Sequence, residues 1–497
     1  MKIFLSGKLD MTTSDKLNKN FSDKDLTLDF AEVEYISSVG LTEILKLRKK
    51  IQDADGTFEI ENLRENVAEV FEMTDALNLQ EVDEKNFYTL RPIQRWMFDT
   101  NLKQAKCTMM NIGLLYRLDY GLDLEKFCRA VEAMTKNHDI FGLRFIFNPQ
   151  TFELCQTFVE ERAELFVEKI STEDLDLRLK NILQPYKLIN SPLYRIKFFE
   201  TPTAKYIFFD FHHAVIDGFS ISVLMAHETK ARYLGRNPKP SNYGYRELIE
   251  EENSLPPEHL ETARLYWQNL YQKFNPEVHL IKSNGTGKFA FGNIKNEIPN
   301  LPVEFLRGND FSEEAFFILA ALLTTAKITG RKDAFISWVH NGRDTMKKSR
   351  VIGILLDQLP LYWNFSADEK ISVECKKIFE LQNDQLTKKA GLDLMYERGV
   401  QDILPCFIFQ REMYVAPIIE GDKTLELIDL PPQNNSVAVP ENGIDVEIDS
   451  DGEKYLIDLE FDTGIFSTDT MNNFVEIYFE VIQQMKVEGM TTHKILK

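Results

Sequence analysis

Residues 211–220 read Phe211-His212-His213-Ala214-Val215-Ile216-Asp217-Gly218-Phe219-Ser220. The stretch before them, residues 206–211, is rich in aromatic and β-branched side chains, which is typical of a largely buried strand. The Asp217-Gly218 pair predicts a turn, and Ser220 is placed to cap a helix over residues 221–234. The two histidines therefore lie at a strand end beside a helix N-terminus. A general base and oriented backbone N–H groups can meet at such a place.

Length and composition indicate a soluble globular protein of about three units. The chain has 497 residues, of which 43% are hydrophobic and 27% charged. Its net charge of −20 argues against nucleic acid or an anionic membrane as a partner. The opening residues 1–4 lead directly into a strand pattern, so no signal peptide is expected. No run of eighteen apolar residues occurs, and five scattered cysteines favour reduced thiols in the cytoplasm.

Residues 1–82 have the pattern of a separate small α/β unit, because strand and helix patterns alternate along them. Strands are expected over residues 2–9, 25–30 and 57–61, and helices over 14–21, 41–52 and 64–77. In the middle helix Leu41, Ile44, Leu47 and Ile51 recur at helical spacing. The acidic residues 80–85 are expected to link this unit to the rest of the chain.

Residues 28–41 and 65–74 resemble the centre and the final helix of STAS domains, the anti-sigma-factor-antagonist fold. The resemblance places Ser38 where regulated members carry a phosphorylated serine, but Ser37 stands where they have an aspartate. Two interpretations remain open: a kinase-controlled switch at Ser38, or serines that only cap the helix beginning near Gly40. The STAS-like domain is expected to be a docking module that recruits a protein partner or mediates self-association.

The remainder resembles the condensation domains of nonribosomal peptide synthetases, within the chloramphenicol-acetyltransferase-like superfamily. His212, His213, Asp217 and Gly218 match the HHxxxDG motif of that family. Six further segments resemble family motifs in order and spacing: residues 89–94, 138–145, 266–267, 341–343, 352–361 and 405–410. The resemblance implies an α/β fold in which the small STAS-like domain (1–82) precedes a two-lobed, V-shaped condensation fold. The lobes are expected at residues 88–268 and 275–497.

The resemblance also assigns roles to the motif residues. His213 is expected to face the reacting centre as the base, since an ammonium must lose a proton before it can attack a thioester. His212 is expected to support the loop, because neighbouring side chains of a strand face opposite sides. Asp217 is expected to be structural, with Arg144, Arg343 or Arg350 as its salt-bridge partner. The Gly218 N–H is expected to help bind the oxyanion.

The function implied is acyl transfer that condenses a carrier-protein-bound acyl thioester with an amine to form an amide. Acyl and peptidyl carrier proteins are expected to act in trans and to supply phosphopantetheine, so the chain itself is expected to bind no cofactor and no metal. Three alternatives stay open: an ester-forming acyltransferase, an epimerisation domain, and a non-catalytic adaptor.

Two departures from the family pattern bear on these alternatives. The second motif has Asn137 and Gly142 where arginines are usual. A later motif has Asp357-Gln358 in place of Asn-Thr, so that Asp357 either binds a cationic substrate or lines a solvated face.

Overall fold

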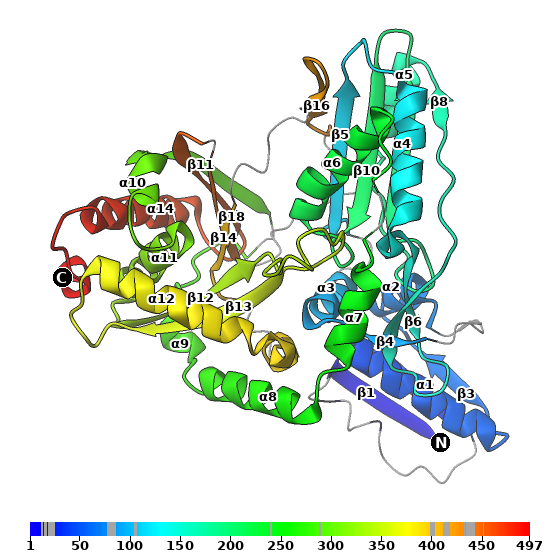
Figure 1. Ribbon diagram of the computed structural model, residues 1–497. Coiled ribbons are helices and arrows are strands. Elements are labelled where there is room, and N and C mark those ends of the chain that lie inside the picture. Colours follow the sequence, from blue (N-terminus) through cyan, green and yellow to red (C-terminus); the bar gives the residue numbers. More distant parts are fainter. Residues whose placement is uncertain are drawn as a thin grey trace. The chain divides into compact units, whose positions relative to one another are not determined.

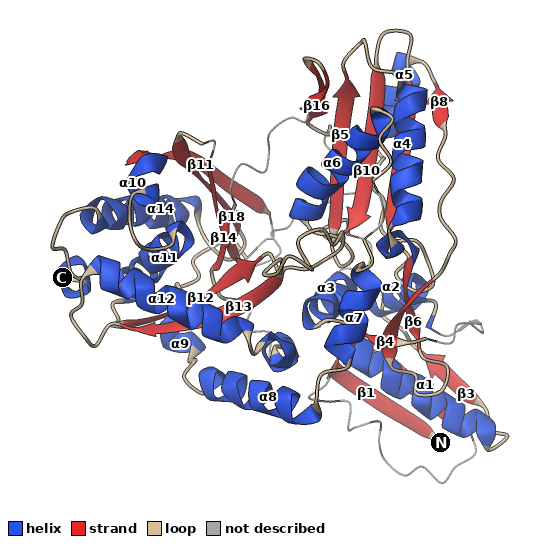
Figure 2. Cartoon of the chain, in the orientation of Figure 1, coloured by secondary structure: helices blue, strands red, loops and turns tan. Residues whose placement is uncertain are grey.

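The structure is a computed structural model of the chain, and it describes most of the residues. These residues pack into two compact units (Figures 1 and 2). The first unit consists of Met1–Ser254 with two later segments, Thr345–Ile354 and Ala416–Ser436, and the second consists of the rest. The predicted division at residues 82, 268 and 275 stays a prediction. The described residues are 1–10, 13, 17, 25–76, 86–103, 107–238, 241–287, 290–397, 403–410, 418–431, 433, 443–450 and 452–497.

In the N-terminal part of the first unit, the described residues form a parallel sheet in the order β1-β2-β3 and two helices. The predicted strands are confirmed, although β2 continues to Ile36 because Val33 and Ile36 add to its buried apolar side. The predicted helices over 41–52 and 64–77 are confirmed, although the second helix ends earlier than expected, at Thr74. The predicted helix over 14–21 lies outside the described residues except for Leu17. The elements are β1 (Lys2–Leu9), β2 (Leu26–Ile36), α1 (Ser38–Asp53), β3 (Phe58–Glu61) and α2 (Glu65–Thr74).

The start of α1 is fixed by a cap and by a close approach. The Ser37 side chain accepts a hydrogen bond from the N–H of Gly40 at 3.3 Å, which confirms the predicted capping role for one of the two serines. A Cβ atom at position 40 would overlap the carbonyl oxygen of Leu9 on β1. Glycine therefore lets the first turn of α1 lie directly against the backbone of β1.

The larger part of the first unit is built on a six-stranded sheet in the order β15-β16-β5-β10-β9-β8. Its strand β16 comes from late in the chain and pairs antiparallel with β5. A second sheet has the order β4-β7-β6. The strands are β4 (Tyr88–Thr89), β5 (Asn111–Leu118), β6 (Leu143–Phe147), β7 (Leu154–Phe158), β8 (Val167–Lys169), β9 (Tyr194–Glu200), β10 (Lys205–His212), β15 (Ile418–Glu420) and β16 (Lys423–Ile428).

Helices cover this sheet and form its core. Leu175 and Leu179 of α5 pack with Leu115, Phe199 and Phe208 of the central strands. Helices α4 and α6 pack against each other, as Figure 1 also shows. The helices are α3 (Pro92–Lys103), α4 (Leu124–Asn137), η3 (Asp139–Gly142), α5 (Thr172–Leu179), η4 (Ser220–Met225), α6 (Ala226–Tyr233) and α7 (Tyr245–Asn253).

The second unit has one six-stranded sheet in the order β11-β18-β17-β14-β12-β13. Helix α11 packs against this sheet and against α12 and α14, so residues 315–326 are buried on every side of the helix. The strands are β11 (Phe291–Pro302), β12 (Asp333–His340), β13 (Asp357–Asn364), β14 (Cys406–Phe409), β17 (Ile444–Ser450) and β18 (Lys454–Asp462). The helices are α8 (Pro257–Tyr271), α9 (Pro276–His279), α10 (Val303–Arg307), α11 (Glu313–Thr329), α12 (Ile371–Leu386), η5 (Lys389–Gly391), α13 (Asp393–Glu397), α14 (Thr468–Met485) and α15 (Thr492–Ile495).

Among the described residues, no helix combines the length and the apolar character needed to cross a membrane.

The contact between Gly40 and β1 predicts a large effect of a small substitution. Gly40→Ala should lower the free energy of unfolding by about 1–3 kcal/mol, the usual cost of overpacking a site that meets backbone. Urea unfolding followed by circular dichroism measures this. Lys49→Ala on the exposed side of α1 is the control and should change the free energy by less than about 0.5 kcal/mol. Equal stability of the two variants would contradict the close approach.

Candidate active site

The two histidines of the motif leave the sheet at the end of β10. His212 is the last residue of this strand and pairs with Asn111 of β5. The next residue, His213, begins the turn, and its N–H donates to the carbonyl of Met110 at 2.7 Å. His212 is fully buried, whereas His213 is half-buried. The expectation that the two rings face opposite sides stays a prediction.

His212 is held at both ring nitrogens. Its Nδ1 accepts a hydrogen bond from the N–H of Ala214 at 3.1 Å, and its Nε2 lies 3.2 Å from Oδ1 of Asn101 on α3. Since an amide N–H only donates and a carbonyl oxygen only accepts, the ring is neutral with its proton on Nε2. Burial, helped by His213 and Arg195, lowers the pKa of His212 to about 3. His212 therefore fixes the turn and stays uncharged near neutral pH.

Asp217 caps the helix that follows the turn. Its Oδ1 accepts a hydrogen bond from the N–H of Ser220 at 2.8 Å, and helical residues begin at Gly218. The prediction that Ser220 caps this helix is thus wrong, while its end near Leu234 is confirmed. Arg144 donates to the carbonyl of Leu143 at 2.9 Å. A salt bridge from Asp217 to Arg144, Arg343 or Arg350 stays a prediction.

Ser220 instead binds a segment from far along the chain. Its hydroxyl donates to the carbonyl of Gly353 at 2.9 Å and accepts from the N–H of Gly353 at 3.0 Å. Gly353 has a φ of 155°, and a Cβ atom there would overlap the ring of Tyr245. The next carbonyl, of Ile354, accepts from Arg91 at 2.8 Å. The start of the predicted motif at 352–361 therefore packs on the histidine turn.

Gln94, the glutamine of the first predicted motif segment, contacts the same turn. Its Nε2 donates to the carbonyl of Ala214 at 3.3 Å, and its Oε1 accepts from the N–H of Arg91 at 2.9 Å. Its amide also exchanges two hydrogen bonds of 3.1 Å with the amide of Gln156 on β7. Two further predicted motif segments, 89–94 and 352–361, thus contact residues 212–220.

Asp210 is a buried acid near the site that the sequence analysis did not select. One of its carboxylate oxygens pairs with Arg195 on β9 at 2.9 Å, and the other accepts from Asn111 at 2.9 Å. Burial outweighs these partners and raises the pKa of Asp210 to about 6. The sequence could have pointed to Asp210, because an aspartate inside an otherwise aromatic strand must find partners on neighbouring strands.

The second motif lacks its two usual arginines, at positions 137 and 142, and different groups surround the two positions. A Cβ atom at Gly142 would overlap the carbonyl of Val159 and the guanidinium of Arg162, so this backbone leaves no room for a side chain. Arg162 donates to the carbonyls of Val159 at 2.6 Å and His138 at 3.3 Å. A guanidinium from another part of the chain therefore lies beside Gly142.

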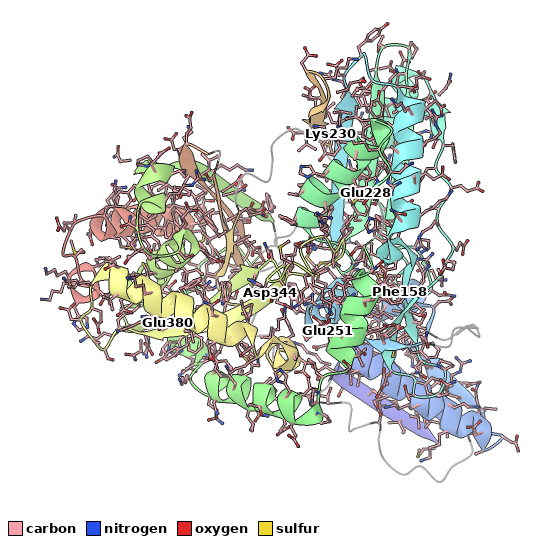
Figure 3. The ribbon with its side chains drawn as sticks, in the orientation of Figure 1. Phe158, Glu228, Lys230, Glu251, Asp344 and Glu380 are labelled. Carbon is pink, nitrogen blue, oxygen red and sulfur yellow. The ribbon has the colours of Figure 1, made fainter. Side chains whose placement is uncertain are left out.

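His138 follows Asn137, the other position at which the family usually has an arginine. Its Nε2 pairs with Glu228 of α6 at 2.7 Å, a residue labelled in Figure 3. The side chain of Asn137 also reaches Glu228, at 3.4 Å. Burial alone would raise the pKa of Glu228, but His138 and Arg232 outweigh it and lower that pKa. Asn137, at the usual arginine position, thus takes part in a hydrogen-bond network around the Glu228 carboxylate.

Asp357 departs from one of the two alternatives predicted for the later motif, and the other, binding of a cationic substrate, stays a prediction. It is buried in the second unit, and its carboxylate pairs with Lys389 at 3.3 Å. The solvated-face interpretation is therefore wrong, and the carboxylate already has a cation of the protein itself. Its neighbour Gln358 donates to the hydroxyl of Ser337 at 2.9 Å.

The neutral, buried state of His212 predicts a loss of stability in acid. Below pH 6.5 the unfolded chain binds a proton at this residue, whereas the folded chain does not until about pH 3, so stability falls as pH falls. Between pH 7 and pH 5 the wild type should lose about 2 kcal/mol more than His212→Asn, which cannot titrate. Urea unfolding at both pH values measures this, and the exposed-residue control His259→Asn should behave as the wild type. Equal losses in the wild type and His212→Asn would show that His212 is protonated in the folded state.

Two family models match the sequence. The Condensation domain model matches residues 84–492, and the STAS domain model matches residues 1–90. Bacitracin synthase 3 of Bacillus licheniformis is 19% identical over 435 residues, which are 82% of this chain and 7% of that protein. Surfactin synthase subunit 2 of Bacillus subtilis (strain 168) is 20% identical over 433 residues, 82% of this chain and 12% of the relative. The chain thus spans a small part of the length of these relatives.

Solved structures show the same fold at low identity. The first condensation domain of the calcium-dependent antibiotic synthetase, bound to a substrate analogue, has a TM-score of 0.62 and 15% identity, covering 82% of this chain and 99% of that one. A mutant starter condensation domain of rhizomide synthetase has a TM-score of 0.65 and 13% identity, covering 82% and 98%. The X-domain from teicoplanin biosynthesis, solved in complex with OxyB, has a TM-score of 0.64 and 14% identity, covering 84% and 97%. The chain belongs to the condensation-domain family and carries a STAS domain at its N-terminus.

Proposed function

We propose that this protein condenses a carrier-bound acyl thioester with an amine, with His213 as the general base. The observation that carries the proposal is the arrangement at the end of β10. His213 is half-buried in the turn, while its neighbour His212 is buried, neutral and hydrogen-bonded at both nitrogens. A helix begins five residues after His213, at Gly218. One histidine supports the turn, and the other is proposed to carry out proton transfer.

The chemistry follows from this arrangement. As the amine nitrogen attacks the thioester carbonyl, His213 takes its proton, the C–N bond forms and a tetrahedral oxyanion develops. The oxyanion is proposed to accept a hydrogen bond from Gly218, whose N–H is the first of the helix and lies outside the ladder of intrahelical bonds. Collapse breaks the C–S bond, and the thiolate leaves with the proton held by His213. An oxyanion donor of this kind is worth about 3 kcal/mol in other enzymes.

The substrates and the location belong to the same proposal. Acyl and peptidyl carrier proteins are proposed to deliver both reactants on phosphopantetheine arms, as the similarity to peptide synthases suggests. Holding two reactants side by side converts a bimolecular step into an intramolecular one, which lowers the barrier without a bound cofactor. A cytoplasmic location is proposed because all five cysteines are free and buried.

A non-catalytic adaptor is the second candidate, and two observations favour it. Position 142 has no room for the side chain that is usual in the family, and the similar X-domain from teicoplanin biosynthesis was solved in complex with OxyB. An ester-forming enzyme of the same family would use the same base and donor with an alcohol in place of the amine. Product analysis separates the three candidates.

His213→Ala should lower the rate of product formation by about 10²–10⁴-fold, the usual contribution of general-base catalysis. The measurement follows thioester loss and product mass with acyl-loaded carrier proteins and a panel of amines and alcohols. His259→Ala, an exposed histidine on α8, is the matched control and should keep the wild-type rate. Equal rates for His213→Ala and the wild type would contradict the role of His213. An absence of product with every carrier would favour the adaptor.

The STAS domain is proposed to bind a protein partner or a second copy of the chain through β1. This strand forms an edge of the described sheet, and the ring of Phe4 on it is 75% exposed. Phe4→Glu should therefore weaken self-association or carrier binding by about tenfold, because the complex would no longer bury this aromatic ring. Sedimentation velocity and carrier titration measure the two effects, with Lys46→Glu on the outer side of α1 as the control. Unchanged mass and affinity would exclude β1 as the contact.

A further inference from the structure

The STAS domain contacts His212 through helix α3. On the STAS side, the N–H and hydroxyl of Ser38 donate to the two carboxylate oxygens of Asp99 at 2.7 and 3.1 Å. Tyr35 donates its hydroxyl to the carbonyl of the same residue at 3.2 Å. Two residues further along α3 lies Asn101, whose Oδ1 receives the Nε2 proton of His212 at 3.2 Å. Only one residue of α3 thus separates the contact with the STAS domain from the contact with the histidine.

A direct contact joins the same two parts. The Nδ2 of Asn101 donates to the thioether sulfur of Met73 on α2 at 3.5 Å, a distance within the range of sulfur acceptors. Asn101 is 1% exposed and Met73 is 7% exposed, so water does not compete for either group. The relay therefore runs from the Met73 thioether through the Asn101 amide to Nε2 of His212.

A second route passes through residues 186–188. The N–H of Leu188 donates to the carbonyl of Met73 at 3.2 Å, and Lys187 pairs with Asp75 at 2.9 Å. The ring of the preceding residue, Tyr186, packs edge-on against the His212 ring with centroids 5.6 Å apart. Two routes from α2 and its C-terminal end therefore meet at one imidazole, one through hydrogen bonds and one through ring packing.

We propose that Met73 and Asn101 are positioning residues for acyl transfer, through which the STAS domain fixes the tautomer and orientation of His212. The inference rests on the proposed catalytic function of the turn that His212 supports. It makes the STAS domain a structural part of the active site, in addition to any surface that it offers to other proteins.

The physical reason lies in the two ends of the Asn101 amide. With its NH₂ group donated to Met73, the amide presents its oxygen to His212, and the ring keeps its proton on Nε2. Without the sulfur acceptor the amide can rotate by half a turn and present NH₂ to Nε2. The ring would then face a donor at each nitrogen while a neutral imidazole has one proton to place, so one contact must break. The turn that carries His213 would shift as a result.

The test compares full-length Met73→Leu with Met134→Leu, a matched substitution of a fully buried methionine on α4 in the same unit. Met73→Leu removes the sulfur acceptor with little change of volume. Two measurements are made: ¹⁵N NMR of histidine-labelled protein, with the His212 signals assigned by their loss in His212→Asn, and kcat and KM with acyl-loaded carrier. We expect the Nε2-protonated signal of His212 to shift or broaden and kcat to fall about tenfold at an unchanged KM.

Met73→Gln is the rescue variant, because its side-chain oxygen can accept from Asn101 in place of sulfur. It should restore the His212 signal and most of kcat, and it keeps the proposal testable if Met73→Leu does not fold. Wild-type signals and rates in Met73→Leu would overturn the proposal. A changed His212 signal in a protein without acyl-transfer activity would support the positioning contact and refute the proposed function, so the two failures are distinguishable.

Discussion

The site depends on one constraint: a histidine buried at a strand end must have both ring nitrogens satisfied. An imidazole in an apolar interior without partners would cost several kcal/mol, and a charged one more. His212 meets the requirement with the N–H of Ala214, two residues further on, and with Asn101 from a helix more than a hundred residues earlier in the chain. The neutral state of the ring follows from these partners. The turn that bears His213 is therefore set by contacts from other segments as much as by its own sequence.

The same dependence on distant residues extends to the whole first unit. The exchange of two hydrogen bonds between Ser220 and Gly353 joins the start of the helix to a segment 133 residues later in the chain. Strand β16 extends the sheet at β5, where Leu425 pairs with Leu118 and Glu426 forms an ion pair with Arg117. An uncovered β5 would present unpaired N–H and C=O groups. The first unit is therefore completed by two later segments of the chain, Thr345–Ile354 and Ala416–Ser436.

Local features of the chain were predictable, and features that depend on long-range partners were not. The composition of residues 206–211 identifies β10, at whose end His212 is buried and His213 half-buried. The helix cap was misassigned because Asp217 and Ser220 are both good capping residues, and only the distant Gly353 decides which one is used. The sequence left a solvated face open for Asp357 because its partner, Lys389, lies on another element. The contact between Arg162 and Gly142 was not predictable for the same reason, because no spacing pattern in the sequence connects the two residues.

The two serines at the start of α1 show how one local pattern serves two purposes. Ser37 caps the helix, whereas Ser38 is fully buried and bonded to both carboxylate oxygens of Asp99. Burial raises the pKa of Asp99, yet its hydrogen bonds from Ser38 favour the charged form. Any added negative charge at Ser38 would face this carboxyl at contact distance, where two unit charges repel by about 4 kcal/mol at an effective dielectric constant of 20. A charged group at Ser38 would therefore weaken the contact between the STAS domain and α3. Because Asp99 and Asn101 lie on the same helix, the contact with Ser38 and the support of His212 depend on one element.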